Sequence, residues 1–526
     1  MGVAELAVSG ADTVKLVRPQ ALIARARTAV SAFIGRTLKG PLHRPVLLRS
    51  FEEYRRVFGG LWQPSTLSYA IEQFFENGGE ECLVVRVCNG GRAPTLRLPA
   101  GNDTLTLIGL APGTREYLRA SVDYDGIAAH EADRFNLVVQ RLRAPGSELI
   151  EEQEIFRRVS VLGHAERSVL SALAESKLVR VHGTLPAERP AVSAGATAAV
   201  GYSASELDGD DGDALTAYDV IGDAERGTGL FALRGAEGFS FLHIPPLTRE
   251  QDVSLPALLV ALRICRERQA MLLLDPPRSW SDAVRTEQGL RSWPLFSEDA
   301  LMFYPRLIGM DRLRGREETF APAAAAAGLI ALANARRPVW SAAADEELLL
   351  RPGLRPAMLV SDLDRERLIQ AGVNVLQTLR AARPRRLGLR TLLGPQAGRN
   401  DYRYASARRL ALFIVSSIEQ GTRWAMFEHP GAALWGQISE QVTAFFESLE
   451  DEGAFVGSRA EENFFIVCDQ RLNGEAPARG AAVRLLCGVA IARPREFHAF
   501  LIEHAHGGSC VRAVSVNRFA LPWAGV

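Results

Sequence analysis

Two residues at the ends of apolar runs, His243 and Asp275, have the types and positions that could support catalysis. Each ends or follows a run expected to form a strand of a parallel sheet, and ligands of such sheets bind at the carboxyl ends of the strands. The chain has no GxSxG nucleophile elbow, and both residues lie near prolines, which suit strand exits. A structural role is therefore favoured over catalysis.

Two further groups could bind a metal ion. The acidic run 208–213 (DGDDGD) invites comparison with an EF-hand loop, which needs Gly at its sixth position and Glu at its twelfth, but Asp213 and Asp219 stand there. His504 and His506 could chelate a metal, yet no third ligand is identifiable, and a solvated strand end is favoured. No GxGxxG or GxxxxGK[ST] phosphate loop is present. We therefore expect neither a metal nor a cofactor, and no enzymatic activity.

The composition excludes several classes of partner. The 526 residues include 61 Lys plus Arg and 61 Asp plus Glu, so no net charge attracts nucleic acid or an anionic membrane. The apolar runs are shorter than the 18 or more residues of a membrane span, and the start of the chain lacks the pattern of a secretory signal. Six scattered cysteines suit reduced thiols. We expect a protein that assembles in the cytoplasm.

The elements that must position these residues alternate between β and α types. The expected strands of the core are Val30–Ile34, Cys82–Cys88, Phe239–Ile244, Ala270–Leu274 and Ala300–Tyr304. One expected helix is capped by Ser65 or Thr66, carries Leu67, Ala70, Ile71, Phe74 and Phe75, and stops at Asn77. Two more are expected from Leu255 to Arg268 and from Ala323 to Asn334. This order predicts a mainly parallel sheet covered on both faces.

A different pattern fills residues 91–190. Short strands at turn-rich spacing are expected at Thr95–Leu98, Thr104–Ile108, Leu118–Val122, Phe135–Gln140 and Leu178–Val181. They predict a small β domain inserted into the α/β frame, followed by a polar, acidic loop.

The region from about residue 386 predicts an α+β module. Apolar residues at helical spacing predict helices over Ala405–Ile418 and Gln437–Glu450. Aromatic and apolar runs predict strands at Trp424–Glu428, Phe464–Cys468, Arg484–Ile491 and Glu496–Ile502.

Both ends of the chain carry short β-like pieces that could not stay folded in isolation. We expect them to be arms that pair with another subunit's sheet. The apolar residues expected to make these contacts are Val14, Leu16, Val17, Val511, Val514, Val516 and Phe519.

The expected fold class is thus α/β and α+β multidomain, with a mainly parallel core sheet, an inserted β domain, a C-terminal α+β module and terminal β arms. The expected segments are an arm (1–26), the first part of the core (27–90), the inserted domain (91–190), a loop (191–231), the second part of the core (232–385), the C-terminal module (386–508) and a second arm (509–526).

The order of several motifs resembles that of contractile tail sheath proteins, found in bacteriophages and in the injection systems derived from them. The C-terminal motifs are Asn400–Tyr404 (NDYRY), Ser417–Trp424 (SIEQGTRW), Phe427–Pro430 (FEHP) and Glu461–Asp469 (EENFFIVCD). Earlier ones are Ala32–Thr37 (AFIGRT), Glu175–Val181 (ESKLVRV) and Thr228–Leu233 (TGLFAL). The resemblance extends from about Ala32 to Ile502. Members of the family commonly begin with a Pro-Gly-Val-Tyr arm, which is absent here.

The resemblance implies a structural subunit. Many copies would form a helical cylinder around an inner tube, linked by exchanged arms, and contraction would drive the tube through a target envelope. The implied partners are the chain itself, the inner tube protein, and baseplate and cap proteins. Two alternatives stay open, a specialised sheath-like ring near the baseplate or cap, and an α/β hydrolase-like enzyme.

The surface that meets the tube is expected on one of the two C-terminal helices. The first offers Arg408 and Arg409, and the second offers Glu440 and Glu447. Either group could instead be a solvated face.

Overall fold

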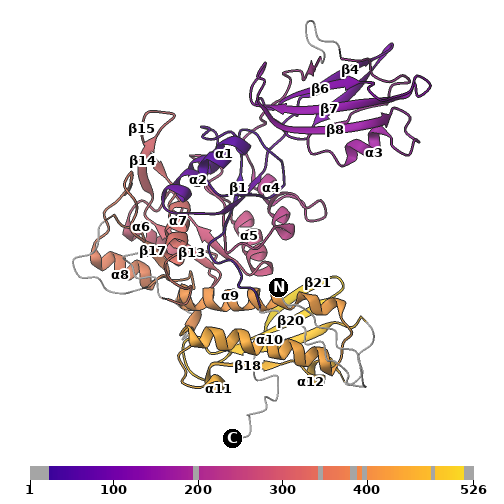
Figure 1. Ribbon diagram of the computed structural model, residues 1–526. Helices are drawn as coiled ribbons and strands as arrows, with labels where there is room; N and C mark the ends of the chain where they lie inside the picture. The colour runs from indigo at the N-terminus through magenta and orange to yellow at the C-terminus, as the bar shows by residue number, and fades with distance from the viewer. Residues whose placement is uncertain are drawn as a thin grey trace, which may run out of the picture. The chain divides into compact units, whose positions relative to one another are not determined.

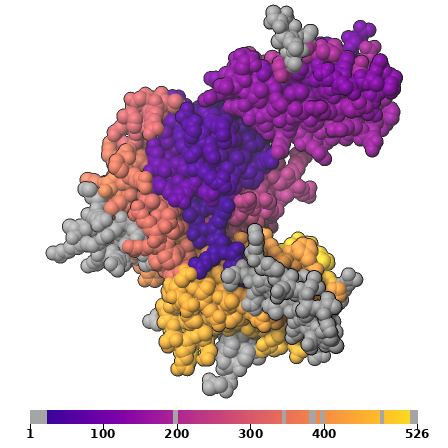
Figure 2. Space-filling view, viewed as in Figure 1, coloured from indigo at the N-terminus to yellow at the C-terminus, as the bar shows by residue number. Residues whose placement is uncertain are grey.

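The computed structural model describes residues 23–193, 201–341, 348–378, 388–393, 400–474 and 480–514 (Figure 1). The chain divides into two compact units. The first, Arg27–Leu412, is called the core unit. The second, called the terminal unit, combines Met1–Ala26 with Phe413–Val526 and is mostly orange to yellow in Figure 2. The mixed α/β, multidomain organisation expected from the sequence is present.

A seven-stranded sheet organises the core unit. Its strands, in spatial order, are β17 (Val373–Val375), β13 (Ala300–Tyr304), β12 (Met271–Leu274), β11 (Phe241–His243), β1 (Ser31–Gly35), β3 (Cys82–Arg86) and β2 (Val46–Leu48). All neighbours pair in parallel except β2, which runs antiparallel to β3. Every residue of β1, β3, β12 and β13 is buried, as their continuous apolar sequences require for a sheet covered on both faces.

The alternation of side chains along these strands builds two separate cores. Phe33, for example, points to one face and Ile34 to the other. The face of Phe33 packs against helices α1 (Phe51–Phe58), α2 (Thr66–Glu76) and α7 (Ala323–Asn334). The face of Ile34 packs against α4 (Ala217–Ile221), the 3-10 helix η1 (Gly229–Gly235), α5 (Leu255–Glu267), α6 (Ala283–Arg291) and α8 (Asp362–Gln370).

Helices α2 and α7 approach each other closely because α7 is rich in small residues. A Cβ at Gly328 would lie 2.3 Å from the carbonyl oxygen of Phe74, so this position requires glycine. The alanine run of α7 is buried on all sides, which explains why its sequence shows no amphipathic stripe.

The inserted domain is a β sandwich with its own apolar core. One sheet has the order β10 (Ser203–Ala204), β6 (Tyr117–Asp123), β7 (Arg134–Leu142) and β8 (Ile150–Ser160). The other has the order β4 (Thr95–Ala100), β5 (Asp103–Gly109) and β9 (Val179–Val181), and helix α3 (Val169–Ala174) precedes β9. Since β10 pairs with β6, the domain continues beyond residue 190, into the segment expected to be a loop.

Several core elements were not expected from the sequence. The longest strand of the inserted domain, β8, carries mostly polar or charged residues without clear alternation and was missed. A three-stranded sheet of β15 (Arg316–Phe320), β14 (Leu307–Asp311) and β16 (Leu354–Pro356) was also missed. The 3-10 helix η4 (Asp401–Arg403) precedes the last helix of the core unit.

That last helix, α9 (Ala405–Gly421), continues into the terminal unit. There it is followed by the 3-10 helix η5 (Arg423–Phe427), helix α10 (Ala432–Asp451) and the short helices α11 (Ala460–Asn463) and α12 (Gln470–Asn473). The expected strand at Trp424–Glu428 is wrong, because this segment is η5. Its aromatic run satisfies strand composition, but its backbone stays helical directly after α9.

An antiparallel sheet completes the terminal unit. Its order is β18 (Phe464–Val467), β19 (Val483–Val489), β20 (His498–Ala505) and β21 (Gly508–Val514). Strand β21 pairs with β20 over its whole length and forms one edge of the sheet. The free arm expected from residue 509 therefore begins no earlier than residue 515.

Candidate functional site

The structure brings His243 and Asp275 together at the carboxyl ends of adjacent parallel strands. The two side chains are 1% and 9% exposed, and His243 Nε2 lies 3.4 Å from Asp275 Oδ2. His243 Nδ1–H donates to the Leu273 carbonyl at 3.2 Å, since a carbonyl can only accept. Asp275 Oδ1 accepts the amide of Ala323, the first residue of α7, at 2.8 Å. Both side chains thus fasten strand ends and a helix start.

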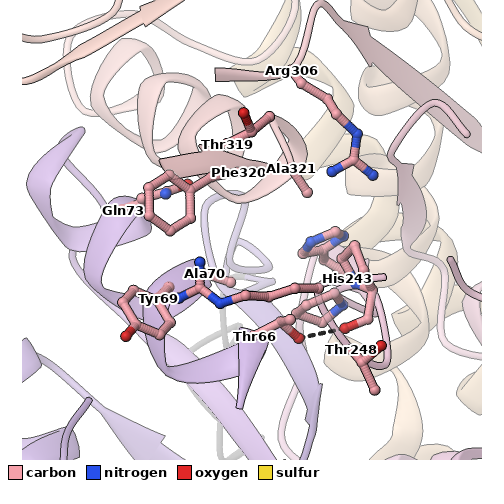
Figure 3. Close-up of a pocket in the computed structure, with 13 residues that line it drawn as sticks. Thr66, Tyr69, Ala70, Gln73, His243, Thr248, Arg306, Thr319, Phe320 and Ala321 are labelled. Carbon is pink, nitrogen blue, oxygen red and sulfur yellow. Dashed lines mark hydrogen bonds between the residues drawn. The ribbon is translucent and has the colours of Figure 1, made fainter. Parts of the chain in front are cut away.

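The cavity beside His243 is small (Figure 3). Its volume is about 40 Å³, which is room for about three water molecules, whereas ligand pockets measure about 300–1,000 Å³. The hydroxyl of Thr66 donates to the carbonyl of Pro246. Among the described residues, no hydroxyl or thiol is hydrogen-bonded to His243 Nε2. The crevice therefore lacks the paired nucleophile and base of a hydrolase.

Polar residues at the rim of the cavity belong to an internal ion pair. The buried carboxylate of Asp311 accepts from the Tyr69 hydroxyl at 3.0 Å and from Arg249 at 2.6 Å. Burial alone would raise the pKa of Asp311, but bonds from the Arg314 amide and these partners outweigh it and lower that pKa. Burial and the bond to Asp311 raise the pKa of Tyr69 to about 12. These groups stabilise the fold and offer no titratable acid or base near neutral pH.

The structure places Arg408 and Arg409 in the interior of the core unit, so their assignment to a tube-facing surface is wrong. They are 8% and 9% exposed. Arg408 Nε lies 2.7 Å from Asp299 Oδ1, and its NH1 lies 3.6 Å from Glu298. Arg409 donates to Asn334 at 2.6 Å. Their charged groups are therefore not available to a partner protein.

The pKa values of the two arginines differ because their partners differ. Burial lowers the pKa of Arg408, but the Asp299 carboxylate outweighs burial and the net pKa is raised. Burial lowers the pKa of Arg409 to about 10, and no carboxylate offsets it. The first arginine is a compensated buried charge and the second is not.

Glu440 and Glu447 lie on the exposed face of α10. They share this face with Gln437 and Asp451, which are also exposed, and the helix contains no Lys or Arg. The opposite face is buried through apolar residues such as Phe446. Helix α10 thus presents an acidic stripe, which stays a candidate for the tube-facing surface.

The side chains of the two metal-site alternatives, the acidic run 208–213 and His504, are hydrogen-bonded to other protein groups. In the acidic loop, Asp208 accepts from Thr95, and Asp211 accepts from Thr114. His504 is 1% exposed, so it is not a solvated strand end. No cluster of three or more His, Cys, Asp or Glu side chains suited to a metal ion occurs among the described residues.

His504 clamps the end of α9 to the terminal sheet. The Thr422 hydroxyl donates to the Ile418 carbonyl, so His504 Nε2–H donates to that hydroxyl oxygen at 2.8 Å. Its Nδ1 then accepts from the Ser509 hydroxyl at 2.7 Å. This arrangement uses the neutral ring, and burial lowers the pKa of His504.

Most of the residues expected to make the arm contacts are not described by the structure. Residues Val14, Leu16, Val17, Val516 and Phe519 lie outside the described residues, whereas Val511 and Val514 belong to the edge strand β21.

Within the terminal unit, the segment that follows the expected N-terminal arm contacts the C-terminal part through residues that the sequence analysis missed. Ile23 is 7% exposed, and a Cβ at Gly421 would lie 2.8 Å from it. Arg25 binds the carboxylate of Glu452 through two hydrogen bonds of 3.0 and 2.5 Å. No local pattern could have revealed this pair, because its members are 427 residues apart in sequence.

Among the described residues, no helix combines the length and the hydropathy needed to cross a membrane.

Comparisons with known proteins found likeness of structure only. A scan against protein-family models gave no match, and neither did a search of curated proteins. A sheath tail protein from Listeria innocua is similar with a TM-score of 0.58 and 13% identity, over 91% of this chain and 96% of that one. The sheath of the PVC extracellular contractile injection system, in its contracted state, is similar with a TM-score of 0.51 and 14% identity, over 94% of this chain and 97% of that one.

Proposed function

We propose that this chain, whose fold is that of contractile tail sheath proteins, is the structural subunit of a contractile sheath. The observation that carries the proposal is the match to two such proteins over more than nine tenths of each chain. The small crevice beside His243 supports a structural role over the enzymatic alternative. The subunits would assemble in the cytoplasm and become part of a phage tail or an extracellular particle.

Exchange of the terminal arms would link the subunits. Val14, Leu16 and Val17 of one copy would pair with an exposed sheet edge of another, and β21 offers such an edge. Val516 and Phe519 extend the chain beyond that same strand. Since donor and acceptor are different parts of the subunit, the contact is head-to-tail and propagates into a helical array.

The folded units would move as rigid bodies during contraction, with the arms as hinges. The assembly would be made in an extended state around an inner tube, between a baseplate and a cap. The energy would be stored in the contacts between subunits, so no nucleotide is needed.

The acidic stripe of α10 is the remaining candidate for contact with the tube. Glu440 and Glu447 lie on one exposed face, and the buried face anchors the helix. A tube surface with basic residues at matching positions would be complementary to it. Arg408 and Arg409 no longer compete for this role.

Negative-stain electron microscopy of the protein, alone and co-expressed with neighbouring genes of its operon, tests the proposal. We expect long tubes or stacked rings. Small discrete particles under both conditions would contradict the polymer.

A truncated chain that lacks residues 1–22 sharpens this test, because it keeps the docked residues Ile23 and Arg25. We expect it to fold with an unchanged thermal midpoint and to fail to polymerise. The full-length variant with Val14, Leu16 and Val17 all changed to Ser should behave alike, and the matched control Lys15→Ser should assemble normally. Normal assembly of the truncated chain would refute the role of the N-terminal arm.

A further inference from the structure

A groove of unpaired arginines lies between helix α1 and the hairpin that joins β7 to β8. Its volume is about 570 Å³. We call it the arginine groove and define it by the exposed residues Arg56, Arg115, Arg143, Leu149 and Ile150.

The charges that line the groove do not balance. Five lining residues are basic (Lys39, Arg55, Arg56, Arg115 and Arg143) and two are acidic (Glu52 and Glu151). Lys39 is paired with Glu151 at 2.6 Å, and Arg55 with Glu52 at 2.8 Å. Within the described ranges, no hydrogen bond or ion pair engages the other three guanidinium groups. The groove therefore keeps three uncompensated positive charges.

Apolar side chains stand beside these charges. Leu149 is 60% exposed and Ile150 is 45% exposed. The half-buried Lys39–Glu151 pair joins the segment that follows β1 to strand β8, and Lys39 is 8% exposed. A groove of unpaired arginines and exposed aliphatic groups suits a segment that carries both carboxylates and apolar side chains.

The chain itself carries a surface of that kind at the start of α8. We call it the acidic knob and define it by Met358, Leu359, Asp362 and Leu363. Leu359 is 94% exposed, the highest value among the large apolar side chains described, and Leu363 is 59% exposed. Asp362 is exposed in the first turn of the helix, and no hydrogen bond or ion pair engages it within the described ranges. Covering these exposed apolar side chains with another protein surface would be favourable, because it removes them from water.

We propose that the arginine groove of one subunit receives the acidic knob of a second copy of this chain. Leu359 and Leu363 would cover Leu149 and Ile150, while Asp362 would pair with Arg115 or Arg143. The two surfaces share no residue, so the contact is head-to-tail and repeats along an array. The inference rests on the proposed function and adds a contact of the core unit that is independent of the arms.

Charge reversal tests the contact within co-expressed assemblies. We expect the double variant Arg115→Glu with Arg143→Glu to reduce the sedimentable, assembled fraction about tenfold or more, because like charges would face each other. The matched control is Arg157→Glu, which reverses an exposed arginine on β8 outside the groove and should assemble normally. Unchanged thermal midpoints would show that each variant folds.

A cross-link identifies the occupant. In a Cys510→Ser background, which removes the exposed native thiol, Leu149→Cys chains would be mixed with Leu359→Cys chains and oxidised. We expect a disulfide-linked dimer of the two variants, and a reduced yield when Asp362→Arg is added to the second. Loss of assembly in the groove variant without this cross-link would overturn the proposal, because another acidic surface would then fill the groove.

The outcomes separate this inference from the proposed function. If the wild-type chain forms tubes and the groove variant forms them equally well, the inference fails and the proposed function stands. If the wild-type chain forms no polymer, the proposed function fails first.

Discussion

Helices α9 and α10 have similar sequence patterns, but their charged residues lie in opposite environments in the structure. Each pairs an apolar stripe with charged residues, yet the arginines of α9 are buried and the carboxylates of α10 are exposed. The difference lies in what covers the polar face. Asp299 and Asn334, more than 70 residues before α9, meet its arginines. Charge on a helix therefore marks either a surface or an internal ion pair, and only the tertiary partners distinguish them.

The strongest test of the comparison is to remove the compensated charge of α9. Arg408→Ala should lower the free energy of unfolding by about 3 kcal/mol. The Asp299 side chain is 4% exposed, and among the described residues it would keep Arg266 as its one ion-pair partner. Urea denaturation would measure the change. As a control, Arg285→Ala removes an exposed pair with Asp282 and should change the same quantity by less than about 0.5 kcal/mol. Equal effects would contradict a buried role for Arg408.

Acidification should weaken the clamp at the end of α9. The pKa of His504 is lowered in the folded state, so the unfolded chain binds the proton more readily. The stabilisation of the fold by the neutral His504 ring is present above the usual histidine pKa of about 6.5. It is lost as pH falls through that value towards the pKa of the folded state. The thermal midpoint should therefore fall between pH 7.5 and pH 5 as this stabilisation is lost. His504→Gln should flatten this dependence, and an unchanged slope would count against the clamp.

The second arginine of α9 should matter less than the first. Arg409→Met removes a buried charge whose direct partner is the amide oxygen of Asn334, and the methionine fills much of the same volume. We expect a change of less than about 1 kcal/mol in the free energy of unfolding, in either direction. Urea denaturation beside Arg408→Ala would measure it. A loss as large as that of Arg408→Ala would show that both arginines are compensated alike.

The smallest effect on stability is expected on α10. Reversing the stripe with Glu440→Lys and Glu447→Lys should change the free energy of unfolding by less than about 0.5 kcal/mol, because both positions are exposed. The same double variant should abolish assembly templated by the tube, counted by electron microscopy. Normal tubes from a normally folded variant would reject the stripe as the tube-facing surface.

The elements that could be predicted from sequence are those with a strong local pattern. Strands β1, β3, β12 and β13 are largely apolar runs, and the composition of these runs located them. Helix α2 was located by its apolar spacing and its cap at Ser65. Strand β8 could not be found in this way, because its side chains are mostly polar or charged and many are partly exposed. Its place is set by pairing with β7. The strand predicted at Trp424–Glu428 was wrong for the opposite reason. Its composition is typical of a strand, but the segment follows helix α9 directly and forms the 3-10 helix η5.

The candidate sites show the same difference between features set by local sequence and features set by tertiary contacts. By itself, the sequence determined that His243 and Asp275 stand at the ends of two apolar runs expected to be strands of a parallel sheet. It also determined that no phosphate loop or nucleophile elbow is present and that α10 has acidic residues on its polar side. Only the tertiary structure decided that the cavity beside His243 is small, that Arg408 lies against Asp299, and that Ile23 and Arg25 contact Gly421 and Glu452. The physical reason is the distance in sequence between the interacting residues. Helix and strand patterns depend on residues a few positions apart, whereas burial and ion pairing join residues that are hundreds of positions apart.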